Sequence, residues 1–389
     1  MIKVVQTVHG KFHHFDLARQ LHRQGMLEAI FTGYPMWKLR NEELPAEKVK
    51  TFPWIRTFLM AKWRFGFENP RLDRELNWWA ALSLDAYVAS HLRECDVFVG
   101  LSGSGLKTGA LTKRRGGRYI CDRGSTHIRF AERIMTEEYQ RWGQTFPGID
   151  PRAVAREEQE YFSADVVTVP SRFCIRSFSE MGVPPEKLRK IPYGVELSLF
   201  RKVADPPSER FEVLFVGQVS FRKGMPYLLD AFSQLKHPHK RLRVVGAMQS
   251  EMKTFLQGKH LEDVEFLGPV PQRDLVPIMS SSHVMVLPSI EDGLGLVLGQ
   301  AMACGCPIIC STNTGGEELL EESQNRFVVP IRDATAICDR LEALCQDKQL
   351  YEAASHAALQ SVKSVGGWNN YGQLYGKLCK DLAVSGCTN

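Results

Sequence analysis

The stretch VMVLPSIEDGLGLVLGQAMACGCPIICST, from Val284 to Thr312, joins two apolar runs through a glycine loop and a run of small residues. VMVLPS and PIICST have the unbroken apolar character of strands that are covered on both faces. IEDGLG has the composition of a turn, and LVLGQAMACG predicts a helix that Gly305 closes and Pro307 stops. A strand, a helix and a second strand in this order predict a parallel α/β sheet.

The same alternation extends over nearly the whole chain. In the front half the predicted strands are IKVVQTV, LEAIFTG, CDVFVGLS, RYICDRG and DVVTVPS. In the back half they are FEVLFVG, RLRVVGA, VEFLGPV, HVMVLPS, PIICST and RFVVP. The polar, proline-bearing segment LFRKVADPPSERF separates the two sets and predicts a linker.

We therefore expect two domains, because 389 residues exceed the size at which one core usually stops growing. The front domain is assigned to residues 1–196 and the back domain to residues 211–365. Residues 366–389 are predicted to form a C-terminal helix that returns to the front domain. Both domains are expected to be doubly wound and Rossmann-like, with ligands bound in the cleft between them, at the carboxyl ends of the strands.

The composition is that of an ordinary globular protein, with 44% hydrophobic and 24% charged residues, which argues against disorder, collagen-like repeats and a coiled coil. The 10 cysteines form no C-x-x-C pair, so reduced thiols and a cytoplasmic protein are expected. We predict neither a signal peptide nor a membrane-spanning helix. Residues 1–190 hold 30 Lys+Arg against 22 Asp+Glu, and such a basic half suits an acidic or membrane-associated substrate or is a solvated surface.

Two glycine-containing turns of the front half do not match nucleotide-binding motifs. VGLSGSGLKTG, residues 99–109, lacks the adjacent Gly and Lys of a Walker loop, so we predict a strand-to-helix turn. No G-x-G-x-x-G follows the first strand, which argues against a dinucleotide oxidoreductase.

Gly10 instead allows a tight turn before a helix whose N-terminal amides face the cleft, where an anion can bind. His9, His13 and His14 lie there without a nearby cysteine or carboxylate at ligand spacing, so no metal is expected.

The loops of the back half carry groups that suit a phosphorylated sugar. Arg222 and Lys223 precede Gly224 at the start of a predicted helix, so two cations and a helix N-terminus can converge on one anion. Gly293 and Gly295 allow a bound ligand to approach the backbone. A carboxylate in this turn and Gln300 on the following helix can hold the hydroxyls of a sugar and a ribose.

Four motifs of the back half occur in a specific order: FVGQVSFRKG, VEFLGPV, VLPSIEDGLGLVLGQAMACGCPII and NTGGEELL. Together, from about Phe211 to Pro330, they resemble the nucleotide-sugar-binding half of retaining glycosyltransferases of family four, the GT-B type. PYGVELSLF and CDRGSTH extend a looser resemblance into the front domain. The resemblance implies metal-independent transfer of a sugar, with retention, from a nucleoside-diphosphate donor to a saccharide, lipid-linked or small-molecule acceptor. The charge of the leaving diphosphate would then be stabilised electrostatically.

The resemblance also implies roles for particular residues. Arg222 and Lys223 match the basic pair that holds the diphosphate, and His127 matches a histidine on the front-domain side of the donor sugar. The residues expected to take part in catalysis are His127, Arg222, Lys223 and Asp292. The residues expected to bind the donor are Gly10, Arg222, Lys223, Val270, Glu291, Asp292, Gly293, Leu294, Gly295, Leu296 and Gln300; no metal ligand is expected.

Three positions depart from the family pattern. The paired glutamates of the family fall on Asp292 and Gln300, and Gln218 stands where arginine is common. Aspartate is one methylene shorter, so Glu291 is an alternative contact to the sugar. Two other functions stay open: a nucleotide-sugar epimerase or hydrolase, for which Asp122, Arg123 and His127 offer acid and base groups, and a non-catalytic subunit that binds sugar nucleotides.

Residues 52–67, FPWIRTFLMAKWRFGF, combine aromatic and basic residues at helical spacing. This composition is that of a helix at a membrane interface or over a lipid-linked acceptor, and equally of an amphipathic helix packed on its own sheet. The protein is thus expected to be cytoplasmic, with peripheral contact to the inner face of the membrane as one alternative. Aromatic and basic residues do not combine into a nucleic-acid platform, so no nucleic-acid partner is expected.

Overall fold

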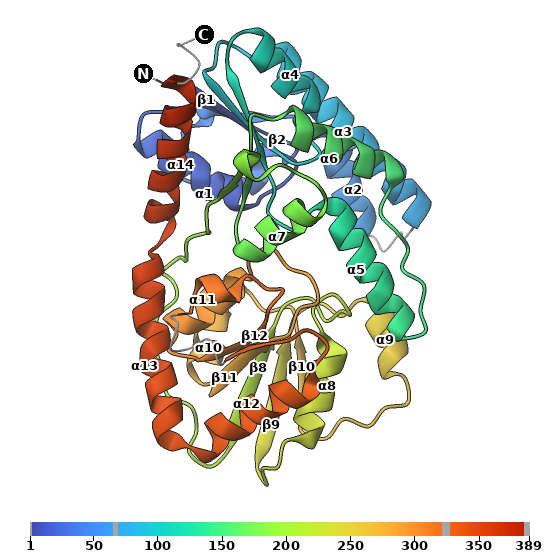
Figure 1. Cartoon of the computed structure of the whole chain (residues 1–389), viewed down its shortest axis with the longest axis vertical. Helices are drawn as coiled ribbons and strands as arrows, with labels where there is room; N and C mark the ends of the chain where they lie inside the picture. Colours follow the sequence, from blue (N-terminus) through green and yellow to red (C-terminus); the bar gives the residue numbers. More distant parts are fainter. Residues whose placement is uncertain (1, 65–68, 321–326, 385–389) are drawn as a thin grey trace.

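The structure, a computed structural model, describes residues 2–64, 69–320 and 327–384. Two parallel sheets follow one another along the long axis of the molecule, and helices cover them (Figure 1). The prediction of two doubly wound, Rossmann-like domains is confirmed.

The first sheet has the strand order β3-β2-β1-β4-β5-β6-β7, and all its neighbouring strands are parallel. Its strands are β1 (Val4–Val8), β2 (Leu27–Thr32), β3 (Val49–Thr51), β4 (Val97–Leu101), β5 (Arg118–Asp122), β6 (Val166–Val169) and β7 (Leu188–Lys190). Its helices are α1 (His13–Arg23), α2 (Trp54–Arg64), α3 (Pro70–His91), α4 (Leu106–Arg114), α5 (Ile128–Arg141), α6 (Pro151–Ser163) and α7 (Arg172–Glu180). The order reverses between β1 and β4, where a parallel sheet places its ligand crevice.

The second sheet repeats this topology with the order β10-β9-β8-β11-β12-β13. Its strands are β8 (Phe211–Val216), β9 (Lys240–Val245), β10 (Val264–Gly268), β11 (Val284–Leu287), β12 (Ile308–Ser311) and β13 (Val328–Val329). Its helices are α8 (Met225–Gln234), α9 (Ser250–Leu256), α10 (Leu275–Ser280), α11 (Leu296–Ala303), α12 (Ala334–Gln346) and α13 (Lys348–Val365), and α14 (Trp368–Val384) follows. Short 3-10 turns are η1 (Met36–Lys38), η2 (Ala46–Lys48), η3 (Pro185–Lys187), η4 (Gln272–Asp274) and η5 (Gly316–Glu318).

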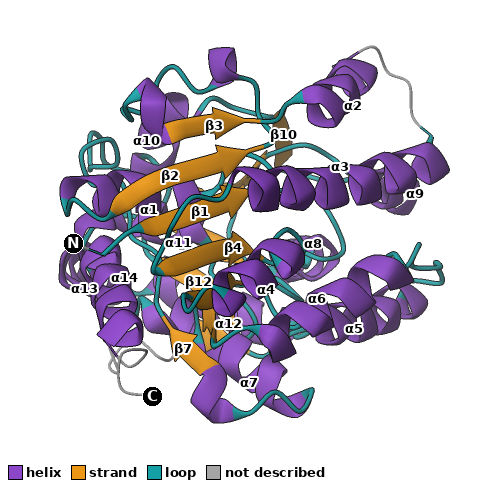
Figure 2. Cartoon of the chain, turned by 90° about the horizontal axis from the view of Figure 1, so that it is seen from above, coloured by secondary structure: helices purple, strands orange, loops and turns teal. Residues whose placement is uncertain are grey.

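Both faces of the first sheet are buried, and the period of two along its strands separates two cores. Val4 belongs to the core beneath α1 and α14, whereas Val5 belongs to the core beneath α3 and α6. Figure 2 shows α3, α4 and α6 on one side of this sheet and α1 and α14 on the other. The edge strands β3 and β7 were not predicted, because each has three residues of which only the first is buried.

The last helix, α14, packs against α1 of the front domain, as predicted for a returning C-terminal helix (Figure 1). Gly372 makes this approach possible, because a Cβ there would lie 2.3 Å from the Cβ of Gln20. The carbonyl of Gly372 also accepts a hydrogen bond from Gln24 Nε2 at 2.9 Å. Residues 385–389 of the predicted helix lie outside the described residues.

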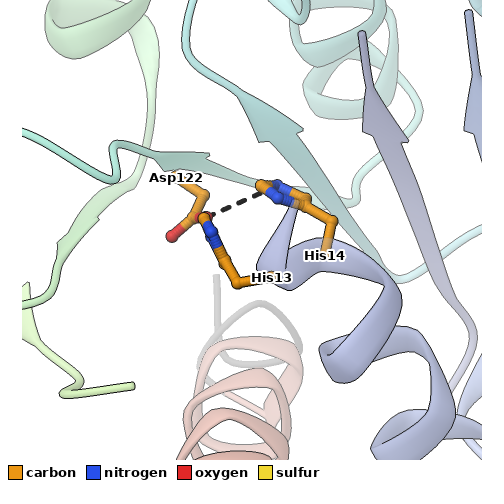
Figure 3. A group of neighbouring side chains, drawn as sticks. All are labelled: His13, His14 and Asp122. Carbon is orange, nitrogen blue, oxygen red and sulfur yellow. Dashed lines mark hydrogen bonds and ion pairs between the residues drawn. The ribbon is translucent and has the colours of Figure 1, made fainter. Parts of the chain in front are cut away.

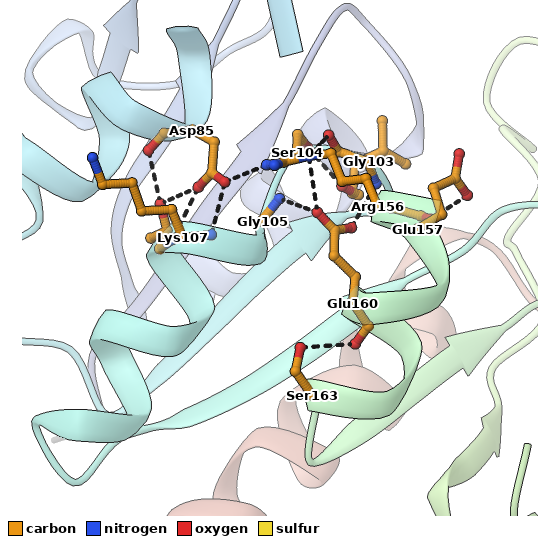
Figure 4. A network of polar contacts seen from close by, with 12 residues as sticks. Asp85, Gly103, Ser104, Gly105, Lys107, Arg156, Glu157, Glu160 and Ser163 are labelled. Atoms are coloured by element: carbon orange, nitrogen blue, oxygen red, sulfur yellow. Dashed lines mark hydrogen bonds and ion pairs between the residues drawn. The ribbon is translucent and has the colours of Figure 1, made fainter. Parts of the chain in front are cut away.

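The glycine loop after β4 is the strand-to-helix turn that its spacing predicted (Figure 4). The backbone amides of Gly103 and Gly105 donate to the two carboxylate oxygens of Glu160, at 2.6 and 2.9 Å. The amide of Lys107 donates to Asp85 Oδ2 at 2.8 Å. Burial raises the pKa of Glu160 to about 8. Carboxyl groups of the protein itself therefore accept the hydrogen bonds that the amides of a phosphate loop would donate to its ligand.

Gly224 gives a stability test of the loop that carries the predicted basic pair. It begins α8 at φ +69°, and a Cβ there would lie 1.9 Å from the carbonyl oxygen of Pro288. Gly258 has a similar φ of +75° with no heavy atom within 4 Å of such a Cβ. We expect Gly258→Ala to cost about 1 kcal/mol from backbone strain alone and Gly224→Ala at least about 2 kcal/mol more. Urea unfolding of both variants measures the difference, and equal losses would contradict the steric argument.

Candidate functional site

The loop between β11 and α11 lies at the boundary between the two domains. A Cβ on Gly293 would lie 2.0 Å from the carbonyl oxygen of Gly124, which follows β5 in the front domain. The carbonyl of Gly293 accepts a hydrogen bond from Ser171 Oγ at 2.6 Å. Within the back domain the amide of Gly295 donates to the carbonyl of Thr314 at 3.1 Å. The loop is thus fixed by backbone contacts from both domains.

Glu291 is buried at this boundary, with 2% of its side chain exposed. One carboxylate oxygen accepts hydrogen bonds of 2.6 Å from the hydroxyls of Ser125 and Thr126 in the front domain. The other oxygen accepts a hydrogen bond of 2.7 Å from Arg222 Nε. Burial opposes ionisation of Glu291, but the Arg222 charge and the two hydroxyls outweigh it and lower the pKa to about 2.

The two predicted cations are paired with the two predicted acids. Lys223 Nζ contacts Asp292 Oδ2, and 14% of the lysine side chain and 13% of the aspartate side chain are exposed. Arg222 is paired with Glu291, and 37% of its side chain is exposed. The nearby carboxylate of Glu291 raises the pKa of Arg222 above its ordinary value. The structure therefore brings Arg222, Lys223, Glu291 and Asp292 together as two adjacent ion pairs.

Beside this loop a cavity of about 1220 Å³ lies between the domains. From the back domain it is lined by Gln272, Leu294, Leu296 and Gln300. From the front domain and the start of α14 its lining includes Lys11, Phe12, His13, Asp16, Arg19, Arg23, Arg123, Gly124, Ser125, Tyr193, Glu196 and Trp368. Polar and aromatic side chains in one cleft at the switch points of two sheets are typical of a ligand site.

Three of the predicted donor-binding residues line this cavity: Leu294, Leu296 and Gln300. Gln300 lines the cavity, and among the described residues none hydrogen-bonds to its side-chain amide. The two ion pairs adjoin the cavity through the loop residues 291–295. Gly10 is buried against Tyr34, while the residues that follow it line the cavity. Val270 packs against the core two residues before the lining residue Gln272.

His127 lies away from the cavity lining. It is 1% exposed, its ring lies 4.9 Å from that of Tyr161, and its Nδ1 accepts the backbone amide of Arg129 at 3.2 Å as the N-cap of α5. Burial lowers the pKa of His127 to about 4. The ring is therefore neutral at pH 7 and caps a helix, and its contact to a donor sugar stays a prediction.

His13 and His14 form a cluster with Asp122, and this contact was not predicted (Figure 3). His13 Nε2 lies 2.5 Å from Asp122 Oδ2, and His14 Nε2 lies 3.4 Å from the same oxygen. Asp122 supplies the carboxylate that was missing near the histidines in the sequence. It is 109 residues from His13, so only the parallel pairing of β1, β4 and β5 brings the two together. The sequence analysis named Asp122 only as an acid group of the alternative epimerase or hydrolase, and its position at the end of β5 was the signal for it.

The chain is similar in sequence and fold to known proteins. Residues 198–361 match the family described as Glycosyl transferases group 1. The match lies in the back half, where the sequence motifs carried the resemblance. A curated relative is the putative colanic acid biosynthesis glycosyltransferase WcaL of Escherichia coli K12, 28% identical over 203 residues, 49% of this chain and 50% of WcaL. The matched region spans about half the length of such relatives.

Solved structures show the same fold over the whole length. A sucrose-phosphate synthase from Thermosynechococcus elongatus has a TM-score of 0.75 at 20% identity, covering 99% of this chain and 100% of its own. Anabaena HepE in complex with UDP and glucose has a TM-score of 0.70 at 16% identity, covering 98% and 100%. Likeness at this level of identity concerns the fold.

The Glu291 contact predicts a specific dependence of stability on acid. The folded-state pKa of about 2 lies below the ordinary 4.5, so Glu291 stabilises the fold above pH 4.5 and loses this contribution as the pH falls toward 2. The difference corresponds to roughly 3 kcal/mol. We expect Glu291→Gln to lower the free energy of unfolding by about this amount at pH 7 and by much less near pH 3.

Urea unfolding between pH 7 and pH 3 measures the free energy of unfolding of the wild type and of Glu291→Gln. The contributions of all other acid-sensitive groups cancel in the difference between the two proteins. Glu262→Gln, at an exposed position of the same domain, is the matched control and should show no such difference. A Glu291→Gln loss that stays constant with pH would contradict the assignment.

Proposed function

We propose that the protein is a retaining, metal-independent glycosyltransferase of family four that takes a sugar from a nucleoside-diphosphate donor. One observation carries the proposal: Gln300 and the start of α11 line an interdomain cavity beside the Lys223–Asp292 pair. A donor in this cavity would place its diphosphate near Lys223 and Arg222, and its ribose near Gln300. The match of residues 198–361 and the UDP bound by a protein of the same fold support this assignment.

The chemistry rests on charge stabilisation. As the bond between the anomeric carbon and the diphosphate breaks, negative charge grows on the leaving group and positive charge on the sugar ring. Lys223 and Arg222, on the loop before α8, would stabilise the former, and Asp292, on the loop before α11, is paired with Lys223. The acceptor is proposed to be a saccharide, a lipid-linked sugar or a small molecule that enters from the front domain.

The deciding experiment is calorimetric and thermal-shift titration with UDP, GDP, ADP, CDP and dTDP, with and without magnesium. A ligand that binds the folded state raises its melting temperature, so one responsive nucleotide would identify the base of the donor. The proposal expects binding that magnesium does not enhance. Binding without any turnover of the matching sugar nucleotide would favour the non-catalytic subunit. The departures from the family pattern at Asp292, Gln300 and Gln218 are compatible with that alternative. Free sugar or an epimerised donor as the product would favour the hydrolase or epimerase.

Lys223 is expected to supply a charge-assisted contact to the diphosphate. Lys223→Met keeps the aliphatic stem and removes the charge, so the affinity for the selected nucleoside diphosphate should fall about 10- to 100-fold. Lys236→Met, at an exposed position of the same domain, should leave the affinity unchanged. Isothermal titration of both variants, with urea unfolding as a check on folding, makes the comparison. Unchanged affinity in Lys223→Met would overturn the phosphate assignment.

Gln300 offers a test of the ribose contact. Gln300→Glu restores the carboxylate of the family and should keep or raise nucleotide affinity, because a charged acceptor makes a stronger hydrogen bond to a hydroxyl. The corresponding nucleoside monophosphate, which retains the ribose, should show the same trend. A loss of more than tenfold would show that this side chain does not meet the ribose.

Peripheral membrane contact through residues 52–67 is a separate proposal, and residues 65–67 lie outside the described residues. Trp54 and Phe58 on α2 are 74% and 57% exposed, whereas Leu59 is buried, so the helix both packs on the domain and presents aromatic rings to solvent. Among the described residues no helix combines the length and apolarity of a membrane-spanning segment. We propose a cytoplasmic protein that lies at the inner membrane face through this helix.

Binding to vesicles tests the proposed contact. Trp54→Ser with Phe58→Ser should release the protein from vesicles of phosphatidylglycerol and phosphatidylethanolamine, because apolar burial and anionic lipid together hold an interfacial helix. Phe162→Ser, at a ring 55% exposed on α6, is the matched control. Co-sedimentation of the wild type and the variants gives the readout. Equal binding of the wild type and both variants to the vesicles would show that α2 does not contact the membrane.

A further inference from the structure

His13 is the first residue of α1 and lines the interdomain cavity. Its Nε2 lies 2.5 Å from Asp122 Oδ2, at the end of β5, and its ring lies against that of Tyr193, tilted by 34° with 4.4 Å between the ring centroids. We propose that His13 is a catalytic base, oriented by Asp122, which removes the proton from the acceptor hydroxyl. This inference rests on the proposed glycosyl transfer and assigns a step of it to the front domain.

Asp122 is arranged to stay ionised. It is 3% exposed, its Oδ1 accepts a hydrogen bond of 2.5 Å from Thr168 Oγ1, and its Oδ2 faces His13. Burial opposes ionisation, but His13 and the hydroxyl outweigh it, and the pKa of Asp122 is lowered. A carboxylate only accepts hydrogen bonds, so His13 Nε2 must carry the hydrogen. Nδ1 then holds the lone pair, and no described residue hydrogen-bonds to it.

His14 contributes no competing charge. It is fully buried, and among the described residues neither ring nitrogen has a hydrogen-bond partner. Burial lowers the pKa of His14 to about 3, so this ring is neutral at pH 7. The negative charge of Asp122 therefore acts mainly on His13.

The three side chains form a group whose ligand atoms lie within 4.8 Å of one another. Two ligands of one zinc ion at about 2.0–2.1 Å from the metal stand roughly 3 Å or more apart. The 2.5 Å between His13 Nε2 and Asp122 Oδ2 is shorter than this and is closer to a short hydrogen bond. The geometry thus favours a hydrogen-bonded dyad.

The dyad lies close to the proposed donor site. A Cβ on Gly124 would lie 3.4 Å from His13 Cε1, and a Cβ on Gly293 would lie 2.0 Å from the Gly124 carbonyl oxygen. One glycine therefore separates the histidine from the donor loop of the back domain. His13 and Gln300 line the same cavity from opposite domains, so an acceptor at His13 and a donor at Gln300 would share this cavity.

In the proposed step the acceptor oxygen forms a bond to the anomeric carbon of the donor sugar. Its proton passes to His13 Nδ1, and the bond from that carbon to the diphosphate oxygen breaks. The electron pair leaves with the diphosphate, whose charge Lys223 and Arg222 would stabilise. Asp122 remains a carboxylate and stabilises the imidazolium, which then releases its proton to solvent.

Water and azide distinguish a base from a structural residue. Water must lose a proton when it attacks a sugar, whereas the azide anion needs no base. With UDP-glucose, GDP-mannose and ADP-glucose as probes, whichever binds, His13→Gln should reduce hydrolysis about 10²- to 10⁴-fold. Formation of the glycosyl azide should stay within a few-fold of the wild type. His22→Gln on the same helix is the control and should change neither rate.

Asp122 acts through His13 as a positioning residue. Its test therefore includes the tautomer of the His13 ring, which the hydrogen bond to Asp122 should fix. In ¹⁵N-histidine spectra of the wild type, assigned with His13→Gln, His13 should carry its hydrogen on Nε2. Asp122→Asn should weaken this preference and reduce hydrolysis while the azide product still forms. The spectra need no donor and read the dyad directly.

Several outcomes would overturn the inference. In the kinetic test they are an equal fall of the hydrolysis and azide rates in His13→Gln, or no measurable hydrolysis by a wild type that binds the donor. In the spectra they are a hydrogen on Nδ1 of His13, or zinc bound at His13. If no nucleotide binds the wild type, the proposed function fails, and the inference fails with it. Binding of nucleotide with no effect of His13→Gln leaves the proposed function intact and removes only the base.

Discussion

Two glutamates buried between the domains hold the arrangement on which the site depends. Glu291 of the back domain accepts hydrogen bonds from Ser125 and Thr126 of the front domain. Glu138 of the front domain is fully buried and accepts from Tyr227 and Arg332 of the back domain, at 2.9 and 2.7 Å. An ionised carboxylate in a dry interior is costly unless several donors face it. Because each set of donors comes partly from the other domain, these contacts select one relative placement of the two sheets.

That placement brings the switch points of both sheets to the same cavity. Gly124 and Gly293 allow the two backbones to touch, since a Cβ on Gly293 would overlap the opposite carbonyl. The back wall then presents Gln300 and the start of α11, and the front wall presents His13. The return of α14 onto α1 adds Trp368 to the lining and ties the front domain to the end of the chain. In the proposed function, donor and acceptor would thus be held by different domains.

The fold could be predicted because its signal is local. Each apolar run such as VMVLPS buries both faces of a strand, and the alternation of such runs with helices defines a parallel sheet. β3 escaped prediction because Val49 is its single buried residue. The loop at Gly103 was interpreted correctly from spacing alone, although nothing local showed that Glu160 would fill its amides.

The site was predictable only as far as its residues belong to local sequence motifs. Lys223, Asp292 and Gln300 follow from motifs at strand ends, where ligands bind in parallel sheets. The partners of Glu291 lie about 165 residues away, and Asp122 lies 109 residues from His13. Pairings at such separations depend on how the domains pack, and no short pattern of residues records them. His127 illustrates the reverse, since a motif selected a residue that the fold uses as a helix cap.

The two ion pairs differ in how easily a substrate can use them. Glu291 is fixed, because both of its oxygens are engaged and its hydroxyl partners belong to the other domain. Lys223 and Asp292 both keep exposed surface, and the lysine is free to exchange a carboxylate for a phosphate of higher charge. Such an exchange would release Asp292 beside the sugar at the moment the diphosphate is bound. The contacts therefore favour Asp292, the shorter acid, over Glu291 as the group that meets the donor sugar.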